Sequence, residues 1–428
     1  MLSQRGYNGS VLSRRRLLAL SAASSAGLWL PARARGAGGS QRRFLFIVAA
    51  GGWDTTYTFS PAFDNPLIDM PADGSVRSEV NGIPFVDSSE RPAVRSFLED
   101  WGRQTCVLNG IELQSVAHPA CMLHMMTGSL HSRTDDWATM LAGGATGDPL
   151  IPLVHLSGPL YAHSQSGVAI RVGEAGQLSE LMSGDALAMS DVPVALPAPS
   201  IEALEDAFVS AQTAAHTAAA GRAQEIAAQA VDAAERRERL EVLADQLDIA
   251  GGETLLERAQ IIHTLFSDGL ARCGMIQHNG WNDFGWDTHG ANELQSDHNE
   301  DLFGALSGIM TDLSSRPGSG GGTLLDEVTV VVLSEMNRYP RLNARSGKEH
   351  WTFTSAMLLG AGVAGGQSLG GYSEYFIGEP VDLGSGELTA GGVSLGPQHL
   401  GATLCQLGGM DPAEHVPDGA PITAAIAG

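Results

Sequence analysis

The residues best suited to chemistry lie in a short glycine-flanked run, Gly285-Trp286-Asp287-Thr288-His289-Gly290. Asp287 and His289 are two positions apart, and residues at this spacing in extended backbone point to the same side. Their carboxylate and imidazole can therefore reach one metal ion or one substrate group. The motif is short, and Asp and Gly are also common in ordinary turns. Its meaning therefore depends on what accompanies it elsewhere in the chain.

Three further polar clusters accompany it: Gly51-Gly52-Trp53-Asp54-Thr55, Ser334-Glu335-Met336-Asn337-Arg338 and Lys348-Glu349-His350-Trp351. The first nearly repeats the Gly-Trp-Asp-Thr run, and the first two directly follow strong strand signals. Open α/β sheets bind their ligands outside the carboxyl ends of the strands. We therefore interpret all four clusters as loops that meet at one edge of a sheet.

Continuous apolar runs predict the strands of that sheet. The runs at 42–50 and 328–333 are typical of strands buried on both faces. Helical periodicity predicts helices over 91–101 and 294–313, and a helix that starts at His118 and stops at Gly128. Further strands are expected at 105–111, 150–156, 168–170 and 353–359. Their alternation predicts an α/β fold with a mostly parallel central sheet flanked by helices.

Two stretches depart from this alternation. Residues 60–90 are rich in Pro, Asp, Asn and Gly, which indicates a surface loop. From about 200 to 272, Ala, Glu, Gln, Arg and Leu prevail, which predicts helices broken near Ala250-Gly251-Gly252. This helical insertion either covers the sheet or forms a hairpin that binds a partner. We expect one domain over 42–428 that contains the insertion.

The N-terminus has the features of an export signal. Paired arginines precede Leu17-Leu18 and a moderately apolar run, and an Ala-x-Ala site ends at Ala34. Residues 1–34 are thus predicted to be a twin-arginine signal peptide, which directs a folded protein to the periplasm or the medium. The run is too short to span a bilayer comfortably, so no stable span is expected after cleavage. A basic tail before an amphipathic helix is the alternative.

The composition limits the partners. A formal charge of −23 argues against binding to nucleic acid or to an anionic membrane. The four cysteines are scattered, with no C-x-x-C pair, so neither a zinc knuckle nor a disulfide framework is indicated.

Two candidate residues have competing interpretations. Asp54 lies just past the end of the first predicted strand, where it is either a ligand or a turn residue that caps the next element. His118 lies at the start of a helix, where free N–H groups attract anions, or else it caps or packs there.

Together these motifs resemble the exported bacterial family known as domain of unknown function 1501, over most of residues 42–415. That family is similar to the alkaline-phosphatase and sulfatase superfamily, in which Asp, His and Glu at strand ends hold divalent metals. The resemblance implies an alkaline-phosphatase-like fold. It also implies a set of metal ligands: Asp54, Asp287, His289, Glu335 and His350.

The chain also departs from the superfamily pattern. The superfamily's nucleophile is a Ser, Thr or modified Cys at the start of the helix after the second strand, and His118 falls near that position. Ser115 is the only hydroxyl nearby, and Ser334 replaces an expected metal-binding Asp. The chain thus resembles the superfamily in its scaffold and in part of its metal ligands, and it lacks the usual nucleophile.

Two functions follow from these observations. The first is a metal-dependent hydrolase of phosphate or sulfate esters, either small molecules or polymers, that uses Zn, Ca or Mn. In it, Arg338 would clamp an oxyanion, and His118 would act as general acid or as an extra ligand. The second is a non-catalytic exported protein that uses the metal cage for structure or for ligand binding. Its partner would be a surface polymer or another secreted protein, docked through the helices of 200–272.

Overall fold

The computed structural model describes residues 42–131, 133–145, 149–171, 199–217, parts of 221–239, and 252–428. Its contacts divide the chain into two compact units. The larger unit comprises Ser40–Leu178 and Ile249–Gly428, and the smaller comprises Met1–Gly39 and Ser179–Asp248. The predicted signal peptide, residues 1–34, lies outside the described residues.

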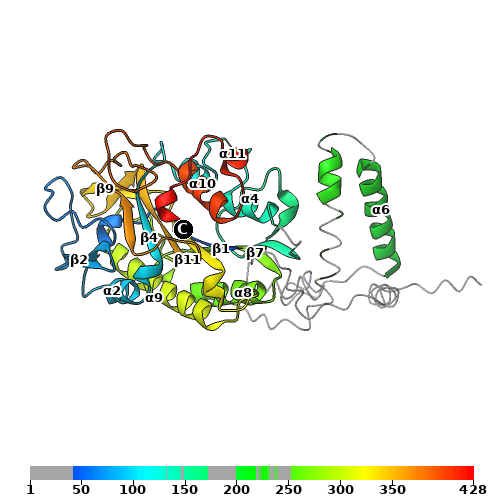
Figure 1. The fold of residues 1–428 in the computed structure, drawn as a ribbon, viewed down its shortest axis with the longest axis horizontal. Helices are drawn as coiled ribbons and strands as arrows, with labels where there is room; N and C mark the ends of the chain where they lie inside the picture. Colours follow the sequence, from blue (N-terminus) through cyan, green and yellow to red (C-terminus); the bar gives the residue numbers. More distant parts are fainter. Residues whose placement is uncertain are drawn as a thin grey trace, which may run out of the picture. The chain divides into compact units, whose positions relative to one another are not determined.

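The larger unit is built on an eight-stranded sheet with the order β12-β4-β11-β8-β1-β7-β5-β6 (Figure 1). Along that order the strands are β12 (Gln367–Gly370), β4 (Thr105–Glu112), β11 (Phe353–Gly360), β8 (Val328–Leu333), β1 (Arg43–Ala49), β7 (Ala271–His278), β5 (Ile151–His155) and β6 (Ala169–Arg171). Within this sheet β11 runs antiparallel to β4 and β8, and the other neighbouring pairs are parallel. The predicted mostly parallel α/β sheet is therefore confirmed.

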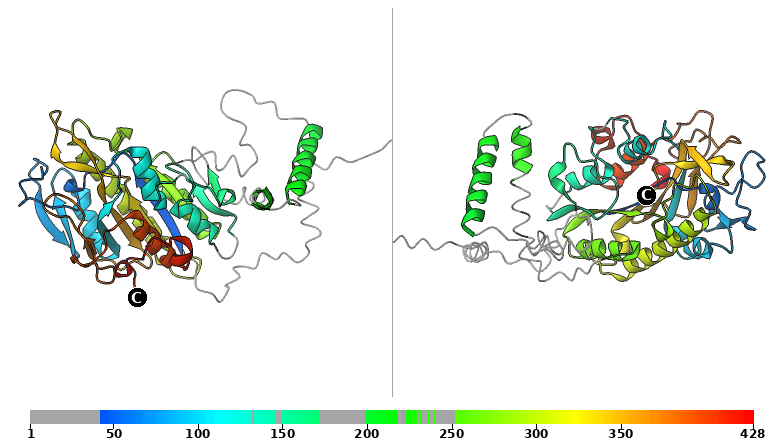
Figure 2. Two further views of the ribbon diagram at one scale, coloured as in Figure 1. Left: turned by 90° about the horizontal axis from the view of Figure 1, so that it is seen from above. Right: turned by 180° about the vertical axis from the view of Figure 1, so that it is seen from behind.

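Strand β1 lies inside the sheet, between β8 and β7, and every one of its residues is buried. Its side chains alternate between the two faces, and Phe44, Phe46 and Val48 belong to the main hydrophobic core. That face is covered by α3 (His118–Thr127), α4 (Trp137–Gly143) and α10 (Pro397–Leu407). The opposite face is covered by α8 (Leu255–Ser267) and α9 (Leu294–Ser315), with α2 (Pro92–Trp101) against α9 (Figures 1 and 2). The helices predicted over 91–101, 118–127 and 294–313 are confirmed.

Two hairpins stand beside the sheet where loops had been expected. Strands β2 (Val76–Val80) and β3 (Ile83–Asp87) pair antiparallel, so the interpretation of 60–90 as loop is wrong for this part. The turn between them is Asn81-Gly82, with φ angles of 52° and 79°, which is a strong hairpin signal. Strands β9 (Asn337–Leu342) and β10 (Lys348–Trp351) form the second hairpin from two of the polar clusters.

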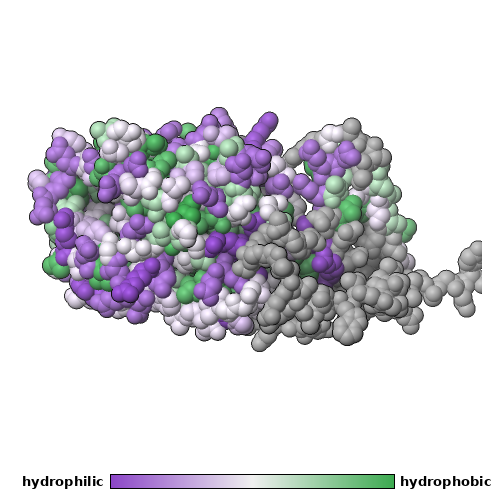
Figure 3. All heavy atoms as spheres, viewed as in Figure 1, coloured by the Kyte–Doolittle hydropathy of each residue, from purple (hydrophilic) through white to green (hydrophobic). Residues whose placement is uncertain are grey.

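The described part of the smaller unit is helical, with α6 (Pro199–Thr217) and a helical stretch at 223–229. None of the helices that the structure describes is long and apolar enough to cross a membrane. On the face of the larger unit drawn in Figure 3, hydrophilic side chains prevail, and hydrophobic ones occupy small separate areas.

Candidate metal centre

The polar clusters gather at the carboxyl end of the parallel strands. Gly51 follows β1, the loop with Asp287 follows β7, and Glu335 follows β8. His118 opens α3, which comes after β4. The β9–β10 hairpin adds His350 from the side. The loops after β7 and β8, the start of α3 and the β9–β10 hairpin therefore contribute side chains to one place, beside Gly51.

Gly51 explains how the loops after β1 and β7 come so close. Its φ is +121°, and a Cβ there would lie 2.8 Å from the backbone nitrogen of Asp287, so a larger residue would clash. Its N–H donates to both carboxylate oxygens of Glu335, at 2.8 and 3.0 Å. The glycine thus joins the loops that follow three neighbouring strands.

Three imidazoles surround the carboxylate of Asp287. His289 Nε2 lies 3.2 Å and His350 Nε2 3.3 Å from Asp287 Oδ1, and His118 Nε2 lies 3.4 Å from Oδ2. The Nε2 atoms of His289 and His350 are 2.8 Å apart. His118, Asp287 and His350 each offer one ligand atom, and these three atoms lie within 4.8 Å of one another.

The second nitrogen of each ring faces an acceptor. His350 Nδ1 lies 2.7 Å from the backbone oxygen of Val116, which can only accept, so this nitrogen carries the hydrogen. His118 Nδ1 lies 2.8 Å from Glu335 Oε1, and His289 Nδ1 lies 2.8 Å from Glu349 Oε2. In their neutral forms, all three rings therefore direct an Nε2 lone pair toward Asp287.

This arrangement fits a divalent metal ion. Metal-bound histidines donate their other ring N–H to a carboxylate or a backbone carbonyl, as these three do. His118 Nε2 is buried and has no hydrogen-bond partner, as expected for an atom that awaits a cation. Imidazole nitrogen with carboxylate oxygen suits Zn or Mn.

The electrostatics favour the protonation state that a metal ligand needs at Asp287 and His350, and oppose it at His118. Burial pushes the pKa of Asp287 upward, but the nearby Arg338 and His289 outweigh it and leave the pKa below its ordinary value. Burial also lowers the pKa of His350. The hydrogen bond to Glu335, against the effect of burial, raises the pKa of His118. Asp287 is thus held as an anion and His350 as a neutral ring.

Arg338 lies inside the protein and is occupied by protein oxygens. It donates to the carbonyls of Gly52 at 2.9 Å and Trp286 at 3.0 Å, and also to that of Gly51. It pairs with Asp287 Oδ1 at 2.7 Å. Its guanidinium thus holds two loops and one ligand in place, whereas the sequence had suggested that it clamps an oxyanion of the substrate.

Glu335 stands behind His118 and lies outside the cluster of converging atoms. Its side chain is 2% exposed, and its oxygens accept from Gly51 N and face His118 Nδ1 and Ser334 Oγ. The structure therefore places this predicted ligand behind His118, whose ring it orients.

Asp54 also lies outside the cluster. Its Oδ1 accepts from Thr56 N at 3.0 Å and from Thr56 Oγ1 at 2.7 Å, so it caps the short 3-10 helix Thr55–Tyr57. Its Oδ2 accepts from Asn292 and pairs with Lys348 Nζ, both at 2.8 Å. Both oxygens are thus engaged, which agrees with the alternative interpretation of Asp54 as a cap.

Sequence reasoning gave no role to three residues that support the centre. Glu349 belongs to the polar cluster at 348–351, but it meets His289 only in the folded chain, so no local pattern predicts that contact. Gln295 accepts from Asp54 N and donates to the carbonyl of Trp286, but a glutamine in the first turn of a helix is unremarkable. Lys348 did have a signal, because it is the only lysine in the chain.

Comparison with known proteins gives a family and a set of distant structures. A family model described as "Protein of unknown function (DUF1501)" matches residues 138–411, more than half of the 428-residue chain. No curated protein matches the chain in sequence.

Among similar solved structures, the PsFucS1 sulfatase from Pseudoalteromonas sp. has a TM-score of 0.41 and 10% identity, over 91% of this chain and 72% of that one. The lipoteichoic acid synthase LtaP from Listeria monocytogenes has a TM-score of 0.38 and 9% identity, over 90% and 76%. The phosphonate monoester hydrolase of Agrobacterium radiobacter has a TM-score of 0.34 and 11% identity, over 89% and 78%. Likeness at this level carries no information about the reaction.

Proposed function

This chain belongs to the family described as "Protein of unknown function (DUF1501)", and from that premise we propose that it is a metal-dependent hydrolase of phosphate or sulfate esters. One observation carries the proposal: three imidazole Nε2 atoms converge on the carboxylate of Asp287 while each ring's Nδ1 faces an acceptor. Structural pairing of histidines does not require three lone pairs to point inward together.

In this proposal His118, Asp287, His289 and His350 hold one divalent ion. Three of these four donors are imidazole nitrogens, which favours Zn or Mn over Ca, because Ca takes oxygen ligands. When bound, the ion supplies Lewis acidity at an ester oxygen and lowers the pKa of a water molecule. His118 is assigned as a ligand, and not as a general acid, because its Nε2 faces the same carboxylate as the other two rings.

The residues behind the ligands fix their orientation. Glu335 and Glu349 each hold the Nδ1 hydrogen of one histidine, and the Val116 carbonyl holds that of His350. Arg338 fixes Asp287 and the loop on which it lies. These contacts preserve the ligand-competent tautomers without a change in structure at the moment of binding.

One observation favours the alternative, a non-catalytic exported protein that uses the ion for structure or for ligand binding. Within the described part of the chain, no serine or threonine hydroxyl is hydrogen-bonded to His118, His289 or His350. A hydrolase here would therefore depend on water as the nucleophile. Export by the twin-arginine route is part of both proposals and rests on residues 1–34 alone.

The test is turnover of aryl phosphate and aryl sulfate esters by protein reconstituted with Zn or Mn. We expect hydrolysis that disappears in Asp287→Ala and His350→Ala, while circular dichroism shows both variants folded. His415→Ala removes an exposed histidine on α11 (Pro412–His415) and serves as the matched control. Metal-loaded protein without turnover of either ester class would overturn the hydrolase proposal and leave the binding alternative.

A further inference from the structure

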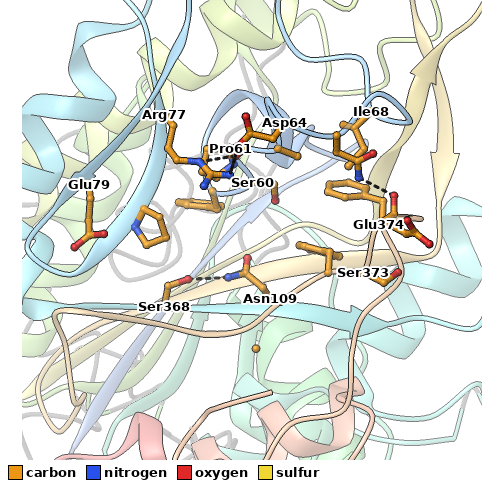
Figure 4. Close-up of a pocket in the computed structure, with 18 of the residues that line it drawn as sticks. Ser60, Pro61, Asp64, Ile68, Arg77, Glu79, Asn109, Ser368, Ser373 and Glu374 are labelled. Carbon is orange, nitrogen blue, oxygen red and sulfur yellow. Dashed lines mark hydrogen bonds and ion pairs between the residues drawn. The ribbon is translucent and has the colours of Figure 1, made fainter. Parts of the chain in front are cut away.

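A cavity of about 840 Å³ lies apart from the metal centre, and none of its lining residues belongs to the four proposed ligands (Figure 4). Four segments form it: the loop 59–68, the β2–β3 hairpin, Asn109 on β4, and the stretch from Ser368 to Phe376. Its volume falls within the range of small-molecule sites. No part of the proposed hydrolysis uses it.

One side of the cavity is lined by neutral hydrogen-bonding groups. Asn109 is 5% exposed and donates from Nδ2 to Ser368 Oγ at 2.8 Å (Figure 4). Its Oδ1 accepts from Ser355 Oγ at 2.7 Å. An amide nitrogen has two hydrogens, so one N–H of Asn109 is left. Because Ser368 Oγ accepts from Asn109, its own O–H is left to donate as well.

Two more serine hydroxyls, on the other walls, also accept a hydrogen bond from the protein. Ser78 Oγ accepts from Arg95 at 3.1 Å, and Ser373 Oγ accepts from the backbone N–H of Tyr375 at 3.3 Å. Each hydroxyl therefore still has its hydrogen to donate. The cavity thus presents several uncharged donors from different directions, which suits a ligand that carries many oxygen atoms.

Rings supply the apolar part of the lining. Phe59 and Phe376 are buried beneath the cavity, at 3% and 1% exposed, and Tyr372 stacks on Phe376 with the ring centroids 4.5 Å apart. Half-buried Tyr372, Pro61 and Pro84 therefore form the apolar surface that a ligand can reach. Aromatic rings contribute large apolar contact areas at little cost in side-chain entropy. A ligand with both hydroxyl groups and C–H faces satisfies the two kinds of wall together.

The charges at the cavity disfavour an anionic ligand. Asp64, Glu79 and Glu374 are exposed, and Arg77 is the only cation among the described residues that line it. Arg77 donates to the carbonyl of Pro61 from two nitrogens, at 2.6 and 3.1 Å, which directs its charge at the protein (Figure 4). A phosphate or sulfate would therefore meet net negative charge here. The carboxylates are exposed to solvent, and the groups deeper in the cavity are neutral. A cationic ligand would therefore find no buried negative charge to pair with.

We propose that this cavity binds a neutral oligosaccharide, with Asn109, Ser368, Ser78 and Ser373 as hydrogen-bond donors and the rings of Tyr372, Pro61 and Pro84 as packing surfaces. The site is independent of the metal centre and of any hydrolytic activity. A saccharide bound here would hold the protein on a glycan whether or not the centre acts on it.

The experiment uses the chain that follows the predicted signal peptide, and four neutral probes: cellotriose, maltotriose, laminaritriose and N,N′,N″-triacetylchitotriose. Saturation-transfer difference NMR and calorimetry at about 10 mM probe detect even millimolar binding. Spermidine and a chondroitin sulfate oligosaccharide serve as cationic and anionic competitors. We expect at least one neutral trisaccharide to bind and neither competitor to displace it.

Two variants locate the site. Ala62→Trp fills the cavity and is expected to weaken binding at least tenfold, whereas Ala72→Trp, on an exposed position outside the lining, leaves it unchanged. Ser368→Ala removes one hydrogen bond and is expected to cost about fivefold, which tests the site even if Ala62→Trp does not fold. The proposal is overturned if no neutral trisaccharide binds, if spermidine or the sulfated oligosaccharide binds in its place, or if binding survives both cavity variants. Loss of metal by EDTA should leave binding intact, so this result and that of the hydrolase assay are separable.

Discussion

The Nε2 atoms of His289 and His350 lie 2.8 Å apart, while the Nδ1 of each ring faces an acceptor of its own. Two neutral rings held in this way would bring lone pair against lone pair. A cation between them, whether a proton or a metal ion, removes that repulsion. The carboxylate of Asp287 beside both atoms provides a compensating negative charge. The pair is therefore the most direct structural support for the proposed metal site.

Metal removal is expected to destabilise the folded protein. A ligand that binds only the native state at about 100 times its Kd adds about 2.7 kcal/mol to the free energy of unfolding. We predict that EDTA lowers the unfolding temperature and that Zn or Mn restores it, with elemental analysis reporting bound metal. His289→Ala should hold less metal than the wild type, and His415→Ala should match it. Purified protein that is metal-free and indifferent to added Zn and Mn would contradict the assignment.

Glu349 is predicted to tune metal affinity although it is exposed to solvent. It orients His289 through Nδ1, and loss of such outer partners typically weakens metal binding 10- to 100-fold. Glu349→Gln keeps an acceptor oxygen but loses the negative charge, so we expect a loss of about tenfold in metal affinity, measured by competition with a chelating dye. The unfolding temperature of the metal-free variant should equal that of metal-free wild type. Unchanged affinity in Glu349→Ala, which removes the acceptor altogether, would refute this role.

In the buried ion pair of Lys348 and Asp54, loss of one charge is predicted to reduce stability more than loss of both. Both side chains are at most 1% exposed, and Lys348 Nζ also donates to Thr56 Oγ1 at 3.0 Å. Removal of one partner of a buried ion pair typically costs 3–5 kcal/mol, roughly, because the other charge is left uncompensated. Lys348→Met should lose about this much in urea denaturation, and adding Asp54→Asn should recover part of it. Additive losses in the double variant would argue against the coupling.

His298 is predicted to make stability depend on pH. Its ring packs on Trp286 at 5.1 Å, and its Nδ1 accepts from Trp281 N at 2.9 Å. Burial, with a contribution from His278, lowers its pKa to about 4, from 6.5. Between pH 6.5 and 4, His298 binds a proton in the unfolded chain but not in the folded protein. The free energy of unfolding is therefore at its full value above pH 6.5 and decreases as the pH falls toward 4. The loss amounts to about 3 kcal/mol.

His298→Gln isolates this effect, because its amide oxygen can still accept from Trp281. The free energies of unfolding of wild type and variant should keep a constant difference above pH 7. That difference should shift in favour of the variant between pH 6.5 and 4. A difference that stays flat over the whole range would show that His298 does not titrate in this way.

The sheet and the meeting of the loops could be predicted from sequence because both depend on local patterns. Apolar runs specified β1 and β8, and the carboxyl ends of parallel strands necessarily share an edge. The separate roles of the acidic residues, as candidate ligand, as orienting group or as structural ion pair, could not be predicted. Asp54 forms an ion pair with Lys348, which lies 294 positions later in the sequence. This pairing makes Asp54 a structural residue. Glu335 reaches His118 only because α3 begins where it does. The β2–β3 hairpin was predictable, since Asn81-Gly82 is a sequence signal for a tight hairpin turn.

The burial of Lys348 also determines how the folded molecule can be probed. As the chain's only lysine, it carries the only side-chain amine, and it sits on β10 next to Glu349 and His350. A lysine-specific protease has one bond to cut in the entire polypeptide, and that bond lies in the hairpin that carries His350. Cleavage can occur only when this hairpin opens. Digestion at that single bond would therefore report how often the hairpin detaches, without any label having to be introduced.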